Sequence, residues 1–297
     1  MTAPLHVLSL SGGKDSAACA LFLRERGIEH VRVFMDTGWE HPDLYAHLDY
    51  LEEKLGPIIR LRSTVDIPAE YEDSVRNFEA RLGVEYSPMV RWCVRKAMFP
   101  SRMVRWCTQE LKVKPFLAWA NAQNDDIVNI VGIRAEESTA RADLPEMDSM
   151  PGADHIQVWR PLIKWTEHDV INIHTRHGVR PCPLYLRGAG RVGCWPCVMA
   201  SKAELRMLAE DDARVGVMRD LERFVSELVA QRRPDSRHSP GWYQARMPEA
   251  DGTYPCWPID RVLEWSRTTH GGRQFELFGS TSRDAGCTRW GLCEMKV

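Results

Sequence analysis

Two cysteines at metal-ligand spacing raise the question of what this chain binds. Cys194 and Cys197 lie in the stretch RVGCWPC, and a Cys-x-x-Cys turn presents two thiolates to one metal site. No second Cys-x-x-Cys follows, although Cys287 and Cys293 offer a more widely spaced pair for a zinc ion. An iron–sulfur cluster is the alternative, because clusters accept irregularly spaced cysteines from distant segments. The spacing alone leaves both metals open.

A glycine pair near the amino end marks a second place for chemistry. In the stretch SLSGGKDS, an apolar run ends and a helical pattern begins, so the amides of Gly12 and Gly13 and the helix dipole form a cradle for an anion. A Walker A loop is excluded, because Leu8 occupies the position of its first glycine and Asp15 follows Lys14. The pattern predicts a phosphate-binding loop of another kind.

A basic segment lies between these two sites. Positions 91 to 114 contain a single acid, Glu110, and seven basic residues: Arg91, Arg95, Lys96, Arg102, Arg105, Lys112 and Lys114. The net charge of the chain is only -2, so a polyanion would have to be attracted by a local patch such as this one. The alternative interpretation is an ordinary solvated helix face.

The elements that must position these residues alternate between strand and helix. HVLSLS, VRVFMDTG and PIIRLRS are typical of buried strands, and KDSAACALFLRERG and HPDLYAHLDYLEEKLG are typical of the helices between them. This order predicts an α/β fold, a doubly wound Rossmann-like parallel sheet with helices on both faces. DIVNIVGIRAEES indicates a further strand whose loop lies at the carboxyl edge of the sheet, where such folds bind ligands.

The second half of the chain is predicted to be mainly helical. PEMDSMPGADHIQ is interpreted as a polar link, and residues 201–233 as one long helix with an apolar face. His174 and His177 are interpreted as a surface face before a helix end. We therefore expect a nucleotide-binding domain over residues 1–165 and a helical, cysteine-containing C-terminal region over residues 166–297.

Composition narrows the classes of function. The 297 residues contain no apolar window near the roughly 18 residues that a membrane span needs, and the amino end does not resemble a signal peptide. We therefore expect a cytoplasmic protein without a membrane partner. Nine cysteines at irregular spacing favour metal or redox chemistry over a disulfide framework, with Cys19 and Cys93 interpreted as core thiols. The oligomeric state is not predicted.

The glycine loop and four later motifs resemble one protein family. FMDTGWEHP, RWCTQELKVKP, GIRAEESTAR, and RPLIKWTEHDV followed by RVGCWPC occur in the order seen in phosphoadenosine-phosphosulfate reductase-like proteins. That family is a branch of the adenine nucleotide α-hydrolases, also called PP-loop ATP pyrophosphatases, and the resemblance spans about residues 5–230. It implies the HUP variant of the Rossmann-like fold.

The resemblance implies that an adenine nucleotide, ATP or a related adenylyl compound, binds together with Mg²⁺. Lys14 and Asp15 are expected to be catalytic, and Asp15 is either a Mg²⁺ ligand or a helix N-terminal carboxylate. Fixed amides and cations would stabilise the charge that develops on leaving pyrophosphate. The implied nucleotide-binding residues are Ser11, Gly12, Gly13, Lys14, Asp15 and Ser16 in the loop, Asp36, Thr37 and Gly38 on the adenosine side, and Gly132, Arg134 and Arg141 on the phosphate side.

One subgroup of this family binds a [4Fe-4S] cluster through adjacent cysteines in the basic segment and a later Cys-x-x-Cys. Here Cys107 has no cysteine beside it, so the resemblance implies a ligand set of Cys107, Cys194 and Cys197, with Cys107 also catalytic. Zinc is the alternative metal. The candidates for a fourth ligand are Cys293, which we include in the metal set, Cys287 and Cys182, or none.

The leading interpretation is an ATP pyrophosphatase-type sulfurtransferase that adenylates an acceptor, expected to be a nucleic acid, and replaces oxygen by sulfur. DNA phosphorothioation systems, with a cysteine desulfurase as sulfur donor, are the model that the resemblance offers. One alternative is reduction of adenylyl sulfate or its 3′-phosphate to sulfite, although the ending GLCEMKV lacks the glycine and histidine of the reductase tail. The other alternative is a non-enzymatic, zinc-stabilised nucleotide-binding partner.

Overall fold

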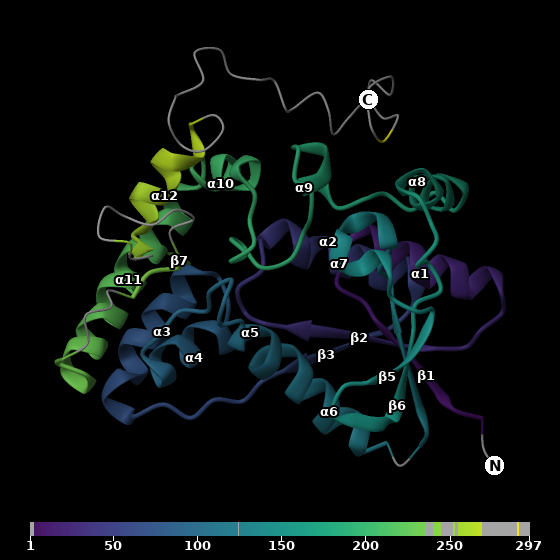
Figure 1. The fold of residues 1–297 in the computed structure, drawn as a ribbon, viewed down its shortest axis with the longest axis horizontal. Coiled ribbons are helices and arrows are strands. Elements are labelled where there is room, and N and C mark those ends of the chain that lie inside the picture. Colours follow the sequence, from purple (N-terminus) through teal and green to yellow (C-terminus); the bar gives the residue numbers. More distant parts are fainter. Residues whose placement is uncertain are drawn as a thin grey trace.

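A six-stranded sheet forms the centre of the molecule (Figure 1). The structure, a computed structural model, describes residues 3–123, 125–235, 240–244, 252, 255–268 and 290. Along the sheet the strand order is β3-β2-β1-β4-β6-β5, and only the edge strand β5 pairs antiparallel. The strands are β1 (Leu5–Ser9), β2 (Val31–Asp36), β3 (Ile58–Arg62), β4 (Ile127–Val131), β5 (Met147–Met150) and β6 (Ala153–Trp159). The predicted doubly wound parallel sheet is confirmed.

Helices cover both faces of this sheet because its strands carry apolar side chains on both sides. Leu8 and Phe34 face a core formed with α1 (Lys14–Glu25), α2 (Pro42–Leu55) and α8 (Glu167–Arg176). Their neighbours Val7 and Val33 point to the opposite face, where they pack against α6 (Lys114–Asn121). The alternation is that of buried strands, in which successive side chains point to opposite faces.

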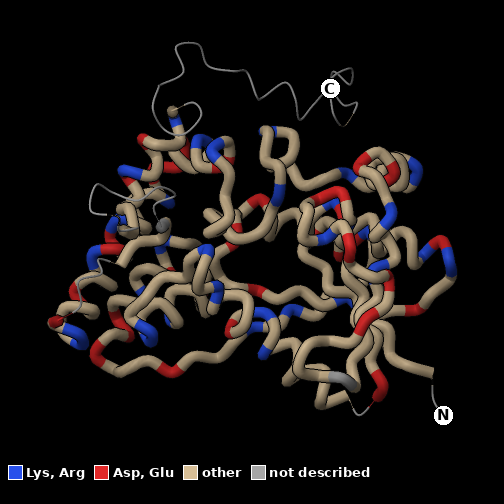
Figure 2. Tube along the Cα trace, viewed as in Figure 1, with Lys and Arg blue, Asp and Glu red and all other residues tan. Residues whose placement is uncertain are grey.

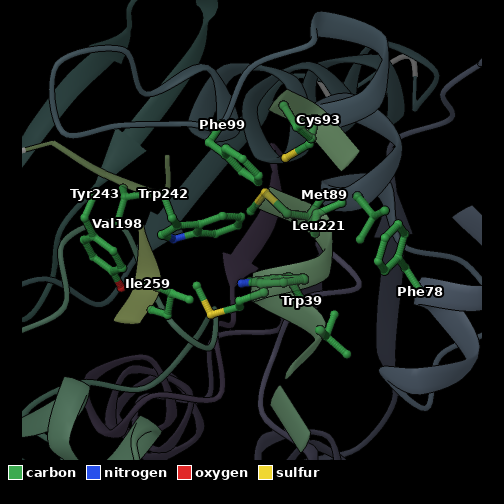
Figure 3. Close-up of a cluster of buried hydrophobic side chains, with 14 of the residues drawn as sticks. Trp39, Phe78, Met89, Cys93, Phe99, Val198, Leu221, Trp242, Tyr243 and Ile259 are labelled. Carbon is green, nitrogen blue, oxygen red and sulfur yellow. The ribbon is translucent and has the colours of Figure 1, made fainter. Parts of the chain in front are cut away.

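A third core lies beside the sheet and joins both halves of the chain. It contains Trp39 from the loop after β2, Met89 and Cys93 from α4, and Leu221 and Trp242 from the C-terminal region (Figure 3). The helices around it are α3 (Glu72–Arg81), α4 (Pro88–Lys96), α10 (Lys202–Leu208), α11 (Asp212–Arg232) and α12 (Ile259–Ser266). The C-terminal region is mainly helical, as predicted, and its core is shared with the loop after β2.

The remaining elements are short. Between α4 and α6 lie α5 (Trp106–Thr108) and the π-helical turn η2 (Gln109–Val113). The other short elements are η1 (Ala69–Tyr71), η3 (Ala135–Glu137), α7 (Thr139–Ala142), α9 (Pro183–Leu186), β7 (Tyr243–Gln244) and β8 (Cys256–Trp257). No helix within the described residues is long and apolar enough to cross a membrane.

Two elements differ from the sequence prediction. The stretch interpreted as a polar link forms β5 and the start of β6, joined through Gly152 at φ +76°. Its polar residues reflect a largely exposed edge strand rather than a loop. The predicted helix over residues 201–233 is interrupted after Leu208, because the Asp211 side chain accepts a hydrogen bond from the amide of Arg214 and starts a new helix there.

Candidate functional site

The loop between β1 and α1 has the geometry of an anion cradle. Gly12 has φ +74°, a backbone conformation that favours glycine, and a Cβ at this position would lie 2.6 Å from Leu44 Cδ1. The backbone conformation and the lack of room for a side chain therefore both require glycine here. Ser16 Oγ donates to the Gly13 carbonyl at 2.9 Å and accepts from the Ser11 amide at 3.1 Å. The serines of the predicted loop therefore hold its turn in place.

Two amides of this loop bond to side-chain hydroxyls. The Gly13 amide donates to Ser11 Oγ at 3.3 Å, and the Lys14 amide donates to the hydroxyl of Tyr185 at 3.2 Å. Both acceptors are neutral oxygens that a phosphate oxygen is able to replace. The first turn of α1 thus presents the donors that the sequence predicted for a phosphate group.

Charges at the start of α1 and after β4 form one buried network. Asp15 Oδ1 accepts from Arg134 Nε at 2.5 Å, and the Lys14 ammonium lies 3.4 Å from Asp15 Oδ2. A Cβ on Gly132 would lie 2.5 Å from the Asp15 carbonyl oxygen, which explains a glycine at the end of β4. Arg141 is more exposed and joins the network through an ion pair with Glu137. In this structure both Asp15 oxygens face cations, and a Mg²⁺ role for Asp15 stays a prediction.

Two residues behind the loop were missed by the sequence interpretation. The Lys14 ammonium lies 5.1 Å from the centre of the Tyr185 ring. His174 is buried, and its Nε2 and Nδ1 lie 2.9 Å and 3.0 Å from the carbonyl oxygens of Lys14 and Val179. The surface role expected for His174 is therefore wrong. The signal was present, because His174 continues the apolar spacing of Val170 and Ile173 on α8.

The predicted adenosine-side residues lie at the carboxyl end of β2, where side chains hold the loop together. Asp36 is buried and accepts from the Gly38 amide at 2.9 Å, from the Tyr45 hydroxyl at 2.8 Å and from Arg62 Nε at 2.7 Å. Gly38 has φ +64°, and a Cβ there would lie 2.5 Å from the Cα of Ser87. Thr37 is fully buried. Asp36 thus organises the loop, and contact with adenosine stays a prediction.

Glu40, which the sequence interpretation did not single out, connects this loop to the Cys-x-x-Cys turn. Its carboxylate accepts from Thr37 Oγ1 at 2.7 Å and from the Tyr45 hydroxyl at 3.0 Å. Burial raises the pKa of Glu40, and the negative charge of Asp36 adds to the rise. Cys194 Sγ lies 4.0 Å from Glu40 Oε1 and 3.6 Å from Thr37 Oγ1. The thiol therefore faces the polar groups of the β2 loop.

Backbone hydrogen bonds dock the Cys-x-x-Cys turn on the same loop. Glu40 and Cys194 form an antiparallel β-bridge, and the Trp195 amide donates to the Trp39 carbonyl at 2.8 Å. The Trp39 indole donates to the Pro196 carbonyl at 3.3 Å. The turn and the β2 loop consequently form one structural unit.

The structure brings Cys107, Cys194 and Cys197 together around Lys112. Burial raises the pKa of Cys107, and the charge of Cys197 raises it further. Burial also raises the pKa of Cys194 to about 12, against the effect of Lys112. In turn, Cys194 makes the largest contribution to a raised pKa of Lys112, with Glu40, Cys197 and Cys107 acting in the same direction. These groups are therefore close enough for their charges to interact.

A metal role for Cys107, Cys194 and Cys197 stays a prediction. Among the described residues, no group of three or more His, Cys, Asp or Glu side chains is placed to hold a metal ion. Cys194 and Cys197 line a small cavity of about 20 Å³, shared with Val192 and Glu204. Cys182 packs in the core of α1, α2 and α8, apart from this set. Cys287 and Cys293 lie outside the described residues.

The basic segment is not uniformly available to a polyanion. Arg91 is buried in ion pairs with Glu72 and Glu79, while Lys96 and Lys114 both pair with Glu110. In the part of the chain that the structure describes, the exposed basic residues of this segment without an ion pair are Arg95, Arg102, Arg105 and Lys112. Basic and acidic residues are interspersed along the chain (Figure 2). Three of these four residues, Arg102, Arg105 and Lys112, lie within five positions of Cys107 in the sequence.

Comparisons with known proteins agree with the motifs. A family model described as the phosphoadenosine phosphosulfate reductase domain matches residues 5–200. An uncharacterized 37.8 kDa protein of Escherichia phage 186 is 32% identical over 335 residues, covering 98% of this chain and 97% of that protein. The adenosine 5′-phosphosulfate reductase of Allochromatium vinosum is 27% identical, covering 64% of this chain and 66% of the reductase. A phosphoadenylyl-sulfate reductase structure from Candida auris superposes with a TM-score of 0.48 at 16% identity, covering 66% of this chain and 84% of that one.

Proposed function

Because the chain belongs to the phosphoadenosine phosphosulfate reductase domain family, we propose that it is a PP-loop ATP pyrophosphatase that acts as a sulfurtransferase. The enzyme adenylates an acceptor, a nucleic acid in this proposal, and exchanges an acceptor oxygen for sulfur. One observation carries the proposal. The Glu40–Cys194 bridge joins the loop after β2 to the Cys-x-x-Cys turn, and this supports a proposal in which nucleotide activation and sulfur delivery act on one acceptor.

The first step is attack of an acceptor oxygen on the α-phosphorus of ATP. A new oxygen–phosphorus bond forms, the bond from the α-phosphorus to the bridging oxygen breaks, and pyrophosphate leaves with the electron pair. The loop amides, Lys14 and Arg134 stabilise the charge that develops on this leaving group. Asp15 holds both cations in place before ATP arrives.

The second step is attack of sulfur on the activated acceptor. A bond from sulfur to the acceptor atom forms, and AMP leaves with the former acceptor oxygen. The sulfur originates as the outer sulfur of a persulfide on a cysteine desulfurase partner. A thiol reductant supplies the two electrons that cleave the persulfide S–S bond, so that the sulfur is delivered as sulfide and the desulfurase cysteine is released as a thiol. Cys107, Cys194 and Cys197 hold the sulfide beside the β2 loop, and the positive charge of Lys112 favours the anionic form of the sulfur.

In this proposal the cysteine set holds a [4Fe-4S] cluster rather than a single zinc ion, because clusters accept irregularly spaced cysteines from distant segments. The three thiols share one location, yet they are not placed to hold one ion. A cluster separates its ligands more widely than a single ion does, because each thiolate binds a different iron. Cys107, Cys194 and Cys197 would hold it, and Lys112 would offset its negative charge. When bound, the cluster would supply an iron position able to carry sulfide if no fourth cysteine binds.

Anaerobic purification followed by iron, zinc and acid-labile sulfide analysis tests the metal part of the proposal. We expect iron and sulfide in wild-type protein and their loss in Cys194→Ser. The matched control is Cys256→Ser, a half-buried cysteine in β8 outside the set, which should retain both. Zinc without sulfide would refute the cluster.

Pyrophosphate release tests the catalytic part. We expect release from ATP with oligonucleotide acceptors under anoxic conditions. It should fall by roughly 10²–10³-fold in Lys14→Met, as for the loss of one transition-state donor. Equal rates in wild type and Lys14→Met, or no release with any acceptor, would refute the adenylation step.

A second candidate function, reduction of a sulfonucleotide to sulfite, is favoured by one contact. Trp290 is buried, its ring lies edge-on to His174 at 5.4 Å, and its centroid is 6.2 Å from that of Tyr185. Tyr185 and His174 both bond to Lys14, so a residue near the carboxyl end of the chain contacts the support of the phosphate loop. Cys293 follows three residues later, outside the described residues. Sulfite release that is lost in Cys293→Ser would favour this function over the first.

A further inference from the structure

An exposed turn over residues 101–105 lies between α4 and α5. The Ser101 amide donates to the Val104 carbonyl at 3.0 Å, and the Val104 amide donates to Ser101 Oγ at 3.0 Å, so hydrogen bonds close the turn. The residues on its two sides, Phe99 and Trp106, are buried in the core beside the sheet. The turn is therefore anchored at both ends while its own side chains point away from the core.

The tip of the 101–105 turn is apolar. Met103 is 79% exposed and Val104 is 50% exposed, which makes them the two most exposed large apolar side chains in the part of the chain that the structure describes. Apolar side chains that stay in water next to each other, with polar groups around them, are typical of a surface that a partner covers.

Two arginines lie on either side of this tip. Arg102 and Arg105 are exposed, and neither forms an ion pair with an acid among the described residues. In the same basic segment, by contrast, Arg91 and Lys96 are paired with glutamates. The turn thus presents two uncompensated positive charges beside two exposed apolar side chains.

The partner that fits this combination is anionic and has exposed apolar faces. A single-stranded nucleic acid offers both, because its phosphates pair with arginine and its bases present faces that are not stacked in a duplex. An anionic lipid surface would match the charges, but two apolar side chains are a small anchor for a membrane. The net charge of -2 also gives the chain no general attraction to such a surface.

The turn is well placed to hold an acceptor. It leads directly into α5 and η2, and η2 contacts β2, the strand that ends at the predicted adenosine-side residues. Cys107 follows the turn by two residues. A strand bound at the turn would therefore lie beside the segments to which the proposed function assigns activation and sulfur transfer.

We infer that the 101–105 turn is a binding surface for single-stranded nucleic acid, in which Arg102 and Arg105 contact phosphates and Met103 packs against a base. The inference rests on the proposed function for one point, that the bound strand is the acceptor. It adds the place on the protein where that acceptor is held. Binding at the turn requires neither ATP nor a metal, so it is measured apart from catalysis.

The charge part is tested with a labelled single-stranded oligonucleotide of mixed sequence, by fluorescence anisotropy at several salt concentrations without ATP. The double variant Arg102→Met and Arg105→Met should bind at least roughly tenfold more weakly at low salt. Its slope of log K against log salt should be smaller by about 1.4, because two phosphate contacts are lost. The matched control is Arg219→Met with Arg223→Met, which removes two exposed arginines paired with acids on another surface and should keep the wild-type slope.

The apolar part is tested with Met103→Ala. We expect roughly tenfold weaker binding with an unchanged salt slope, because an apolar contact is lost and no charge is removed. Met147→Ala, at an exposed methionine on β5, is the control and should bind as wild type does. Since Met103 is exposed, its variant should unfold in urea as wild type does, which separates lost binding from misfolding.

Equal affinity and equal salt slope in wild type and the double arginine variant would overturn the inference. Turn-dependent binding to phosphatidylserine vesicles, without binding to the oligonucleotide, would overturn it as well. The proposed function fails separately. A protein that binds the oligonucleotide through the turn but releases no pyrophosphate would refute adenylation and leave the binding surface. Pyrophosphate release with unaltered binding in the turn variants would refute the surface alone.

Discussion

The carboxylate of Glu222 is expected to make the docking of the C-terminal region dependent on pH. Glu222, on α11, is buried and accepts from the Ile259 amide at 2.9 Å and from the Trp242 amide at 3.5 Å. Trp242 stacks on Trp39 at 4.8 Å, so this carboxylate supports the core behind the cysteine turn (Figure 3). Burial raises the pKa of Glu222 from 4.5 to about 7, against the effect of the two amides.

The sign and size of the effect follow from linkage. The pKa in the folded protein lies above that in the unfolded chain, so the stabilisation is full below about pH 4.5 and is lost as pH rises through 7. Keeping the carboxylate ionised in the folded protein then costs about 3 kcal/mol. Most of this loss in the free energy of unfolding occurs as the pH rises from about 5 to about 8.

Urea unfolding of wild type and Glu222→Gln at several pH values measures this directly. The difference in unfolding free energy between the two proteins should change by about 3 kcal/mol from pH 4.5 to pH 8, with wild type losing stability relative to the variant. Glu227→Gln, an exposed carboxylate on the same helix, is the control and should run parallel to wild type. Parallel curves for wild type and Glu222→Gln would refute the reasoning.

Three further substitutions probe the site and its support. Trp242→Ala empties a fully buried position and should lower the unfolding free energy by about 3–5 kcal/mol in urea titrations, whereas an effect below about 1 kcal/mol would contradict the packing described. Gly12→Ala places a side chain where φ is +74° and should weaken binding of an ATP analogue at least roughly tenfold by calorimetry, with unchanged affinity as the contrary result. Asp15→Asn leaves Arg134 without its buried partner and should cost about 3 kcal/mol of stability. Adding Arg134→Met should recover part of that loss, and additive losses would argue against the pair.

Local patterns were sufficient for much of the fold and for the glycine turn between β1 and α1. Alternating strands and helices predicted the parallel sheet, because buried strands and amphipathic helices have distinct periodicities. The pair Gly12–Gly13 at a strand end predicted the turn. At Gly12 the positive φ angle and the nearby Leu44 side chain leave no place for a larger residue. Local patterns failed at β5, whose exposed polar residues resemble a loop, and at Asp211, whose side chain starts a new helix.

Contacts between residues far apart in the sequence were the part of the candidate site that local sequence patterns could not predict. The resemblance to a family brought Cys107 and the later cysteine pair into one expected set, and the structure places them around Lys112. Nothing in the sequence singled out Glu40, Tyr185 or Arg214 for that site. Each of them acts through contacts with segments more than a hundred residues away.

The sequence by itself determined the sheet and the glycine turn between β1 and α1, because these depend on residue type and short spacing. Only the tertiary structure decided which charges are compensated. Arg91 and Lys112 occur in the same basic run, yet Arg91 is neutralised by two glutamates while Lys112 lies among thiols. The physical reason is that burial and charge pairing depend on which segments pack together, and that packing also places the Arg214 guanidinium on the Glu40 carbonyl and the Trp39 ring.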